Sequence, residues 1–334
     1  MNKLVRFLPL LCAIFIGAGG IYIEMDRENV PEAAGSVVEV LVSPGQSARA
    51  IASEFERAGA VTDAGRLARQ MVRAGIDRKL TPGVYRVTAG RPREVVRELA
   101  GMKPDVPRVT ILPGALWDDI ASSLAPSGGS ALLEAALAKG GNFPEGLRTL
   151  LPEETRDRIV YLAPETYALD PGDGLADGLV RAASGMWWKQ HGESIPSGAT
   201  GEDLRSLGIL ASIVQKEALA DADRPVIAGV FKNRLAKDMP LQSCATVVHA
   251  WRERGVKITS VSYNDVKIDS PFNTYIHKGL PPENVGTPSE TSWEAALRPA
   301  GTDMLFFFAK SDGTHVFTRT YEEHLASQKA ERGR

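Results

Sequence analysis

The hydrophobic pattern of the chain begins with one long apolar run near the N-terminus. Residues 7–23 contain no charged side chain, and Lys3 and Arg6 precede them. A run of this length lies at the short end of the range for a membrane-spanning helix. A cleaved signal peptide is the alternative, but no Ala-x-Ala cleavage site follows the run. We expect a single-pass anchor at residues 7–23, with residues 1–6 cytoplasmic because positive charge precedes the span.

A strand–turn–helix pattern then recurs after a polar linker at residues 24–37. It appears as "VLVSPGQSARAIASEF" (40–55), "YRVTAGRPREVVRELA" (85–100) and "VTILPGALWDDIASSLA" (109–125), with a weaker copy at 167–180. The glycine permits the turn, and an aliphatic residue six positions later packs the helix back on the strand. Residues 38–106 are therefore predicted to form an α/β subdomain. Such a unit resembles the LysM type of glycan-binding module; a small supporting domain is the alternative.

The pattern changes from about residue 200 and predicts an α+β region with long loops. Helices are expected at 202–219, 224–238 and 290–298, and a β-hairpin at 303–320. Loops rich in polar residues, proline and glycine are expected at 239–247 and 269–289, where they could line a cleft. We assign residues 107–334 to one functional region with its core at 200–325.

Composition and charge exclude several classes of function. The chain is 43% hydrophobic and 24% charged, with a net charge of −2, which gives no support for bulk nucleic-acid binding. Cys12 lies in the apolar run, far from Cys244, so no disulfide is expected. The five histidines lack metal-ligand spacing, and no phosphate-binding or dinucleotide motif is present. We expect neither a metal nor an organic cofactor.

The stretch "LASIVQKEA" (210–218) places a carboxylate on an apolar helix face. Leu210, Ile213 and Val214 precede Glu217 by seven, four and three residues, so all four share one face. Burial there raises the pKa of a carboxyl group, which suits a general acid at neutral pH. The alternative is a structural carboxylate that pairs with Arg224 or caps a loop.

Six ordered blocks in the second half of the chain resemble one family. They are "LASIVQKEA", "VFKNRL" (230–235), "MPLQSCATV" (239–247), "NTY" (273–275), "GLPP" (279–282) and "FFAKSDGTHVFT" (307–318). Their order and spacing are similar to those of the YceG-like family of endolytic murein transglycosylases. The resemblance implies a membrane-anchored α+β enzyme of the cell inner (cytoplasmic) membrane, with its catalytic domain on the outer face. Its substrate would be the glycan strands of peptidoglycan, and its partners peptidoglycan synthases and the elongation or division machinery.

The implied reaction breaks the bond between N-acetylmuramic acid and N-acetylglucosamine without water. The product ends in a 1,6-anhydro sugar, and the resemblance gives the catalytic role to Glu217. A hydrolytic glycosidase needs a second carboxylate. A transglycosylase does not, because the C6 hydroxyl of the sugar attacks and one glutamate can act as acid and then as base.

Other polar residues of these blocks are candidates for sugar binding, since sugar rings need hydrogen bonds at their edges and apolar contacts on their faces. The predicted substrate-binding residues are Asn233, Gln242, Thr246, Asn273, Thr274 and Tyr275. Structural alternatives exist: Asn233 could tie two helices together, and Asn273 could stabilise a turn. Tyr161, Glu165, Tyr167 and His315 are weaker groove candidates, and Trp187 and Trp188 favour a core role.

Departures from the family pattern keep two other functions open. Gln215 and Cys244–Ala245 stand where relatives carry a glutamate and Asp-Pro, and residues 283–287 also differ. The first alternative is a catalytically silent glycan-binding scaffold. The second is a hydrolase that uses Glu217 with another acid; the candidates are Glu165, Asp221 and Asp269.

Overall fold

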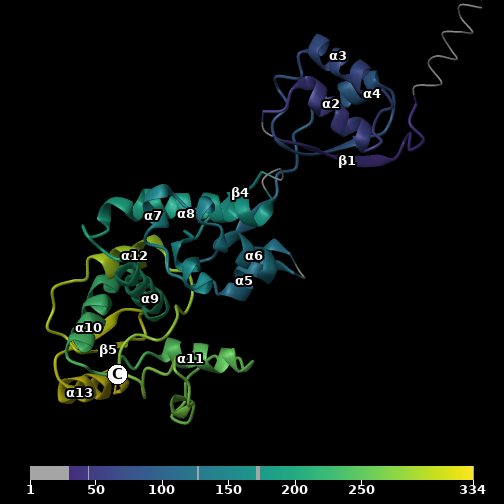
Figure 1. Cartoon of the computed structure of the whole chain (residues 1–334). Coiled ribbons are helices and arrows are strands. Elements are labelled where there is room, and N and C mark those ends of the chain that lie inside the picture. Colours follow the sequence, from purple (N-terminus) through teal and green to yellow (C-terminus); the bar gives the residue numbers. More distant parts are fainter. Residues whose placement is uncertain (1–29, 44, 126–127, 171–173, 334) are drawn as a thin grey trace, which may run out of the picture. The chain divides into compact units, whose positions relative to one another are not determined.

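The computed structural model describes residues 30–43, 45–125, 128–170 and 174–333. The expected anchor at 7–23, the tail at 1–6 and residues 24–29 of the expected linker lie outside the described residues. Within the described ranges, no helix is both long enough and apolar enough to cross a bilayer. The chain forms two compact units, which Figure 1 colours from purple to yellow along the sequence. The first contains the described residues up to Pro107 together with Ala168–Gly174, and the second contains the rest.

The first unit is a two-stranded antiparallel sheet with three helices. Its elements are β1 (Val37–Val42), α2 (Ala48–Arg57), α3 (Ala64–Ala74), β2 (Gly83–Thr88) and α4 (Pro92–Leu99). Alternate residues of both strands are buried, and the helices supply large apolar side chains to the same core. The predicted strand–turn–helix units at 40–55 and 85–100 are therefore confirmed. They do not stack as separate repeats, because the strand of one pairs with the strand of the other.

The chain then continues through a mainly helical region. Its helices are α5 (Trp117–Leu124), α6 (Gly129–Ala138), α7 (Glu145–Arg148), α8 (Leu175–His191), α9 (Gly201–Glu217), α10 (Arg224–Ala236), α11 (Cys244–Glu253), α12 (Glu290–Leu297) and α13 (Tyr321–Arg332). Its strands are β3 (Arg108–Thr110), β4 (Thr166–Ala168), β5 (Phe306–Ala309) and β6 (His315–Thr318). β3 pairs with β4, and β5 with β6. Short 3-10 helices lie at Gly140–Asn142, Thr155–Tyr161, Gly192–Ser194, Asp221–Asp223 and Asp265–Lys267. The predicted α+β character is confirmed.

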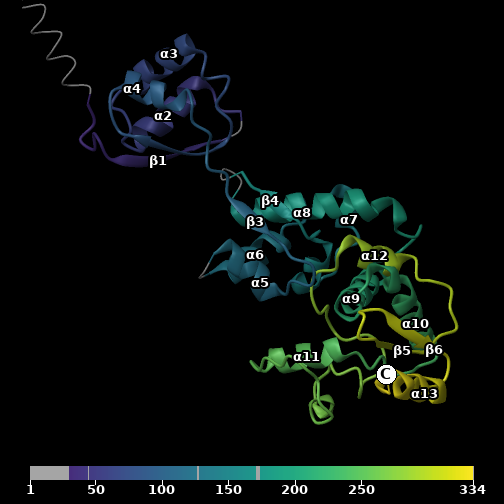
Figure 2. The same ribbon diagram turned by 180° about the vertical axis from the view of Figure 1, so that it is seen from behind.

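Helix α9 lies at the centre of the second unit. It packs against α10, α11 and α12, and Figure 2 shows α9, α10 and α12 side by side from behind. The close approach depends on Gly208, where a Cβ atom would lie 2.7 Å from Val160 and 3.2 Å from Trp293. A larger residue at this position would push α9 off its neighbours.

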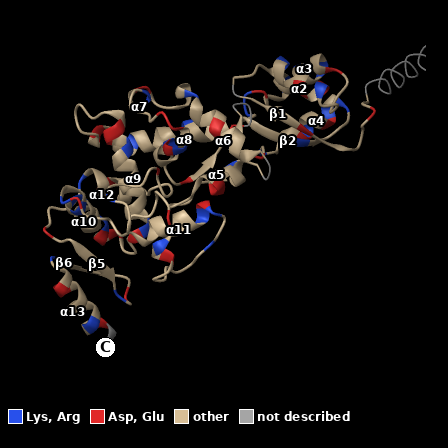
Figure 3. Ribbon diagram, turned by 60° about the horizontal axis from the view of Figure 1, so that its bottom comes forward, with Lys and Arg blue, Asp and Glu red and all other residues tan. Residues whose placement is uncertain are grey.

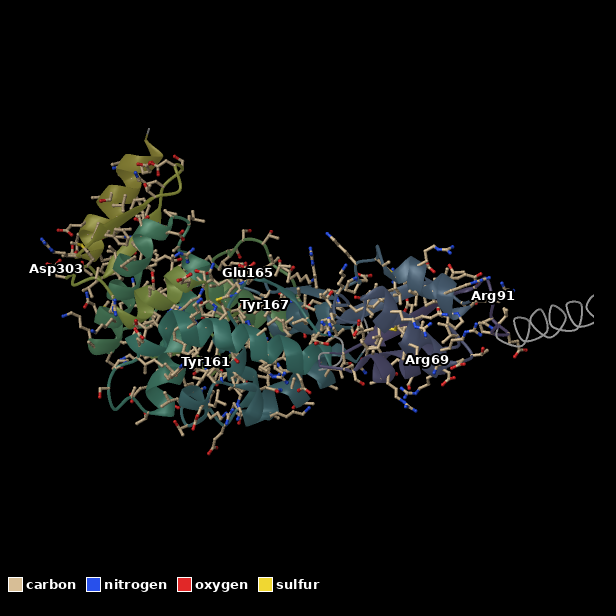
Figure 4. All side chains as sticks on the ribbon, turned by 90° about the horizontal axis from the view of Figure 1, so that it is seen from above. Arg69, Arg91, Tyr161, Glu165, Tyr167 and Asp303 are labelled. Carbon is tan, nitrogen blue, oxygen red and sulfur yellow. The ribbon has the colours of Figure 1, made fainter. Side chains whose placement is uncertain are left out.

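An aromatic cluster forms part of the core beside α9. Trp187 lies edge-on to Tyr161 and to Trp293, with ring centroids 5.0 Å apart in each pair. Trp187 therefore has the core role expected for it. Tyr161 and Tyr167 are also buried, which contradicts their assignment as groove candidates; Figure 4 labels both, together with the exposed Glu165.

Most of the elements predicted from residue 200 onward are present in the structure, and one predicted loop is partly helical. The helices expected at 202–219, 224–238 and 290–298 correspond to α9, α10 and α12, and the hairpin corresponds to β5 and β6. The loop expected at 239–247 is wrong in its second half, because α11 begins at Cys244. Val247 and Ala250 on this helix are buried, so tertiary packing outweighs the weak helix propensity of the local β-branched residues.

Candidate active site

Glu217 is the last residue of α9. Ile213 and Val214 are fully buried and Leu210 nearly so, which confirms the apolar stripe that the spacing predicts. Glu217 itself is half-buried at the end of this stripe. The helix therefore delivers a carboxyl group from the hydrophobic core to the edge of an open space.

The carboxyl group meets the N-terminus of α11. Its Oε1 atom accepts a hydrogen bond of 2.5 Å from the Ser243 hydroxyl and a longer one of 3.4 Å from the backbone N–H of Ala245. The first N–H groups of a helix have no partner within the helix, and they attract negative charge. The ionised form of Glu217 is therefore stabilised by α11.

Burial and hydrogen bonding act on the pKa of Glu217 in opposite directions. Burial raises it, because the surrounding protein disfavours the charged form. The Ser243 hydroxyl, the α11 backbone and the nearby His315 lower it, and burial is the larger effect. The net result is a carboxyl group with a raised pKa that still has partners for its ionised state.

Two buried threonines hold the turn that carries Ser243. The backbone N–H of Ser243 donates to Thr274 Oγ1 at 3.0 Å, and Thr246 Oγ1 donates to the Ser243 carbonyl at 2.8 Å. The two threonine hydroxyls also contact each other at 2.8 Å. Residue Gln242, next to Ser243, has a φ of 52°, which an ordinary side chain adopts only when its surroundings hold it there.

Glu217 lines two cavities. The first has a volume of about 470 Å³ and runs along α11; Lys216, Val248, Arg252 and Val285 are among its lining residues. The second has a volume of about 730 Å³ and is lined by aromatic side chains of the hairpin and its surroundings, including Tyr275 and Phe306–Phe308. Among the described residues that line these two cavities, Glu217 is the only acid.

The six predicted substrate-binding residues divide into two groups. Gln242 and Tyr275 line the second cavity with Glu217. Thr246, Asn273 and Thr274 are fully buried and line neither cavity, so the structure gives them a supporting position. Asn233 also lines neither cavity, and its amide donates to the backbone carbonyls of Thr302 and Met304.

Asn273 holds the loop that carries Tyr275. Its amide donates to the carbonyls of Val266 and Ile268 at 2.9 and 2.8 Å, and its oxygen accepts from the Tyr275 N–H at 3.0 Å. This is the turn-stabilising arrangement that was the structural alternative for Asn273.

Three further residues of the site are Ser243, Arg234 and Lys216. Ser243 belongs to the "MPLQSCATV" block, which was the signal that could have found it. Arg234 lines the second cavity, and its guanidinium lies 5.2 Å above the Phe306 ring. Lys216 Nζ donates to the Gly114 carbonyl at 2.6 Å and so ties α9 to the Pro-Gly turn before α5. No local pattern indicates that contact, because the two residues are 102 positions apart.

Arg224 does not pair with Glu217. Its guanidinium donates to the Asp221 carboxylate at 2.7 Å, to the Ser292 hydroxyl at 2.6 Å and to Gln215 Oε1 at 3.4 Å. Gln215 Oε1 also accepts from Ser289 and Ser292. The residue that stands in place of a family glutamate is therefore a hydrogen-bond acceptor between helices and lies outside both cavities.

His315 also lines the second cavity. Asp223 Oδ2 lies 2.8 Å from its Nδ1 atom and accepts from its backbone N–H at 2.9 Å. The carboxylate thereby fixes the imidazole ring. The candidate second acids Glu165, Asp221 and Asp269 line neither cavity, and all three are exposed.

The fold and this site define an α+β protein that presents one carboxyl group of raised pKa to two cavities. Comparison with known families makes the assignment: the chain belongs to the YceG-like family, whose model matches residues 40–330.

Curated relatives and a solved structure agree with the family assignment. A Bacillus subtilis (strain 168) protein named endolytic murein transglycosylase is 28% identical over 327 residues, covering 93% of this chain and 89% of the relative. A Streptococcus pneumoniae (strain D39) protein of the same name is 30% identical over 245 residues, covering 66% of this chain and 44% of the relative. A crystal structure of a YceG-like protein from Listeria monocytogenes matches with a TM-score of 0.52 and 25% identity, covering 88% of this chain and 100% of that one.

Proposed function

We propose that this protein is an endolytic murein transglycosylase. It cuts peptidoglycan glycan strands internally, between N-acetylmuramic acid and N-acetylglucosamine, and leaves 1,6-anhydro ends. The observation that carries the proposal is the position of Glu217, a carboxyl group of raised pKa at the junction of two cavities. Two cavities that share Glu217 leave room for sugars beyond the cleaved bond, as internal cleavage requires. The names of the relatives support the same activity.

Glu217 acts first as an acid and then as a base. Its proton passes to the glycosidic oxygen as the bond from that oxygen to C1 of muramic acid breaks. The carboxylate then takes the proton of the C6 hydroxyl while O6 forms a bond with C1. Glu217 ends the cycle protonated, and neither water nor a cofactor is consumed.

The surroundings of Glu217 suit both stages. Burial raises the pKa of the carboxyl group and so favours the protonated form, as a general acid requires. The Ser243 hydroxyl and the Ala245 N–H stabilise the carboxylate when it forms. The absence of a second acid among the described cavity-lining residues favours this reaction over hydrolysis, which needs one.

Substrate contacts are assigned to the residues that reach the cavities. Gln242 offers an amide, and Tyr275 offers a ring and a hydroxyl beside Cys244. Stacking on aromatic rings suits the apolar faces of sugars. Thr246, Thr274, Asn273 and Asn233 act on the substrate indirectly, by holding the backbone that carries these groups.

The first unit and the N-terminal run give the enzyme its location. We propose that the first unit is a LysM-like module that contacts glycan, and that residues 7–23 anchor the chain in the cytoplasmic membrane with the catalytic unit outside. Partnership with peptidoglycan synthases and with the elongation or division machinery follows from the resemblance alone.

Mass spectrometry of the cleavage products tests the reaction. The full chain in detergent is incubated with uncrosslinked glycan strands beside its Glu217→Gln variant, with Glu165→Gln as the matched control because that carboxylate is exposed and lines neither cavity. We expect anhydro-ended fragments from the parent and the control. Loss of the acid is expected to slow cleavage by about 10²–10⁴-fold.

Two results would contradict the proposal. Reducing ends that incorporate labelled oxygen from water would identify a hydrolase. Strand binding without cleavage by the parent would identify a glycan-binding scaffold.

A further inference from the structure

One face of α11 lines the first cavity. Ala245, Val248, His249 and Arg252 all line it, and their positions i, i+3, i+4 and i+7 share one side of a helix. Ala245, at one end of this face of α11, contacts Glu217 of α9. Arg252 lies at the other end of the face. The helix rises 1.5 Å per residue, so Arg252 lies about 10 Å along the axis from Ala245.

The two cavities differ in chemistry. Lys216 and Arg252 carry the positive charge of the first, where Thr259 and Ser260 add hydroxyl groups. Burial lowers the pKa of His249 to about 4, so His249 is neutral at physiological pH and adds no charge. The second cavity is mainly aromatic along its hairpin side, and the guanidinium of its Arg234 donates to the backbone carbonyls of Leu305 and Leu241. An uncharged sugar suits the second cavity, and an acidic substituent suits the first.

The guanidinium of Arg252 has N–H donors available for an acidic ligand. One of its terminal nitrogens lies 3.3 Å from Asp119 Oδ1, and the side chain remains 31% exposed. Asp119 is shared, because its Oδ2 atom accepts from the Leu116 N–H at the start of α5. Glu253 and Glu283 lie with Arg252 around a neighbouring small cavity and do not line this one. Figure 3 shows the basic residues of α11 and the segment after it.

The spacing from Glu217 to Arg252 fits a stem peptide. Muramic acid carries its stem on C3 through a lactyl group, and the second stem residue carries a free carboxylate. The lactyl group and the first two residues of the stem together span at most about 10 Å when extended. The muramic acid whose C1 reacts at Glu217 can therefore place that carboxylate at the far end of the α11 face.

We propose that the first cavity binds the stem peptide of the muramic acid at the cleaved bond, with Arg252 as the residue that recognises its carboxylate. This inference rests on the proposed function and adds to it the orientation of the glycan strand in the site. The strand lies with its muramic acid side over α11 and its departing N-acetylglucosamine side over the aromatic cavity. Arg252 is thus a specificity-determining residue that leaves the acid–base chemistry of Glu217 unchanged.

The test separates binding from cleavage. Binding is measured in the Glu217→Gln background with short glycan strands that carry an alanyl-glutamate stem, strands stripped of stems, and strands whose stem carboxylate is amidated. We expect about tenfold tighter binding of the acidic stem, as a charge-assisted hydrogen bond would give. Arg252→Gln should abolish that preference and leave the affinity for stripped strands unchanged. Lys257→Gln, an exposed residue outside the cavity with the same change in charge, should preserve it.

Each outcome decides between the two ideas. If no preference exists, or if Arg252→Gln weakens binding of all three strands equally, the stem site is refuted and Arg252 only supports the cavity wall. A preference that Arg252→Gln removes, combined with a parent protein that cleaves no strand, would keep the stem site and refute the transglycosylase function. Cleavage by the parent protein without any preference for the acidic stem would keep the transglycosylase function and refute the stem site.

Discussion

The hydrogen bond from Ser243 to Glu217 offers a direct test of the proposed acid–base cycle. Ser243→Ala removes the hydroxyl that donates to Oε1 at 2.5 Å and leaves the Ala245 N–H in place. Ser243 is buried, and its side chain makes no hydrogen bond that caps α11, so the fold should tolerate the change. Glu217 keeps its position at the end of α9, and only the stabilisation of its ionised form is weakened.

The expected size of the effect follows from the charge on the acceptor. A hydrogen bond to a charged group contributes about 1.5–3 kcal/mol, more than one to a neutral group. Negative charge develops on Glu217 as its proton leaves, so most of this stabilisation is present in the transition state and absent from the protonated ground state. The loss in kcat/KM should therefore be about 10- to 150-fold, at 1.36 kcal/mol for each factor of ten.

The pH profile of kcat/KM distinguishes this mechanism from simple damage. The first stage needs protonated Glu217, so activity falls as the pH rises through its pKa. Ser243 donates to the charged form and lowers that pKa, while burial raises it. Removing Ser243 should therefore move the descending limb to higher pH and lower the plateau at the same time. The measurement is release of anhydro-ended fragments across the pH range.

A matched substitution keeps the result interpretable. Ser270→Ala removes another buried serine hydroxyl, one that accepts from the Phe272 N–H and lines neither cavity. Ser270→Ala should leave the descending limb of the kcat/KM profile unchanged. The Ser243 hydroxyl would not stabilise the carboxylate during the reaction if the descending limb of the kcat/KM profile of Ser243→Ala stayed in place or moved to lower pH. An unchanged plateau of kcat/KM would refute that view as well.

Three other substitutions test the surroundings of the site. Glu217→Gln should match the parent in stability near about pH 4 and exceed it at neutral pH, because a carboxyl group whose pKa is raised in the folded state contributes less stability as the pH rises. Thermal unfolding at both pH values checks this. Gln215→Leu should cost about 1–3 kcal/mol, because it removes the oxygen that accepts from Arg224, from the Ser289 N–H and from the Ser292 hydroxyl. Gln215→Glu keeps an acceptor there and should stay near the parent in denaturant titrations. Gly286→Ala should cost about 1–3 kcal/mol and lower activity, because φ is 134° there and a Cβ atom would lie 2.7 Å from the Gly114 carbonyl; unchanged unfolding and cleavage would contradict this.

The loops that differ from the family pattern have defined places in this structure. Asn284 and Val285 are buried: the Asn284 N–H donates to Asp157, and the Val285 N–H donates to Ser212 on α9 at 3.0 Å. Val285 lines the first cavity. Cys244 is a free, exposed thiol that lines both cavities as the first residue of α11. The changed residues therefore shape the cavities and leave the contact of Glu217 with Ser243 in place. One of them, Ala245, supplies a backbone N–H to Glu217 that a proline at this position would lack.

Local pattern alone was sufficient for most of the elements and for the central candidate. Periodicity in "LASIVQKEA" placed Glu217 on an apolar helix face, because side chains three, four and seven residues apart meet on one side of a helix whatever its surroundings. Alternation and a Ser-Asp-Gly-Thr turn indicated the hairpin of β5 and β6, and turn glycines indicated the strand–turn–helix units. These features depend on neighbours along the chain, so the sequence contains them.

The tertiary structure alone decided what Glu217 faces. Ser243 is 26 positions from Glu217, and Gly114 is 102 positions from Lys216, so no local rule could bring these pairs together. The same holds for Asn273, Thr246 and Thr274: their residue types suit sugars equally well, and only their burial shows that they hold the backbone. Local sequence sets which face of a helix is apolar. The partner that covers that face, and the pKa that results, depend on packing between segments distant in the chain.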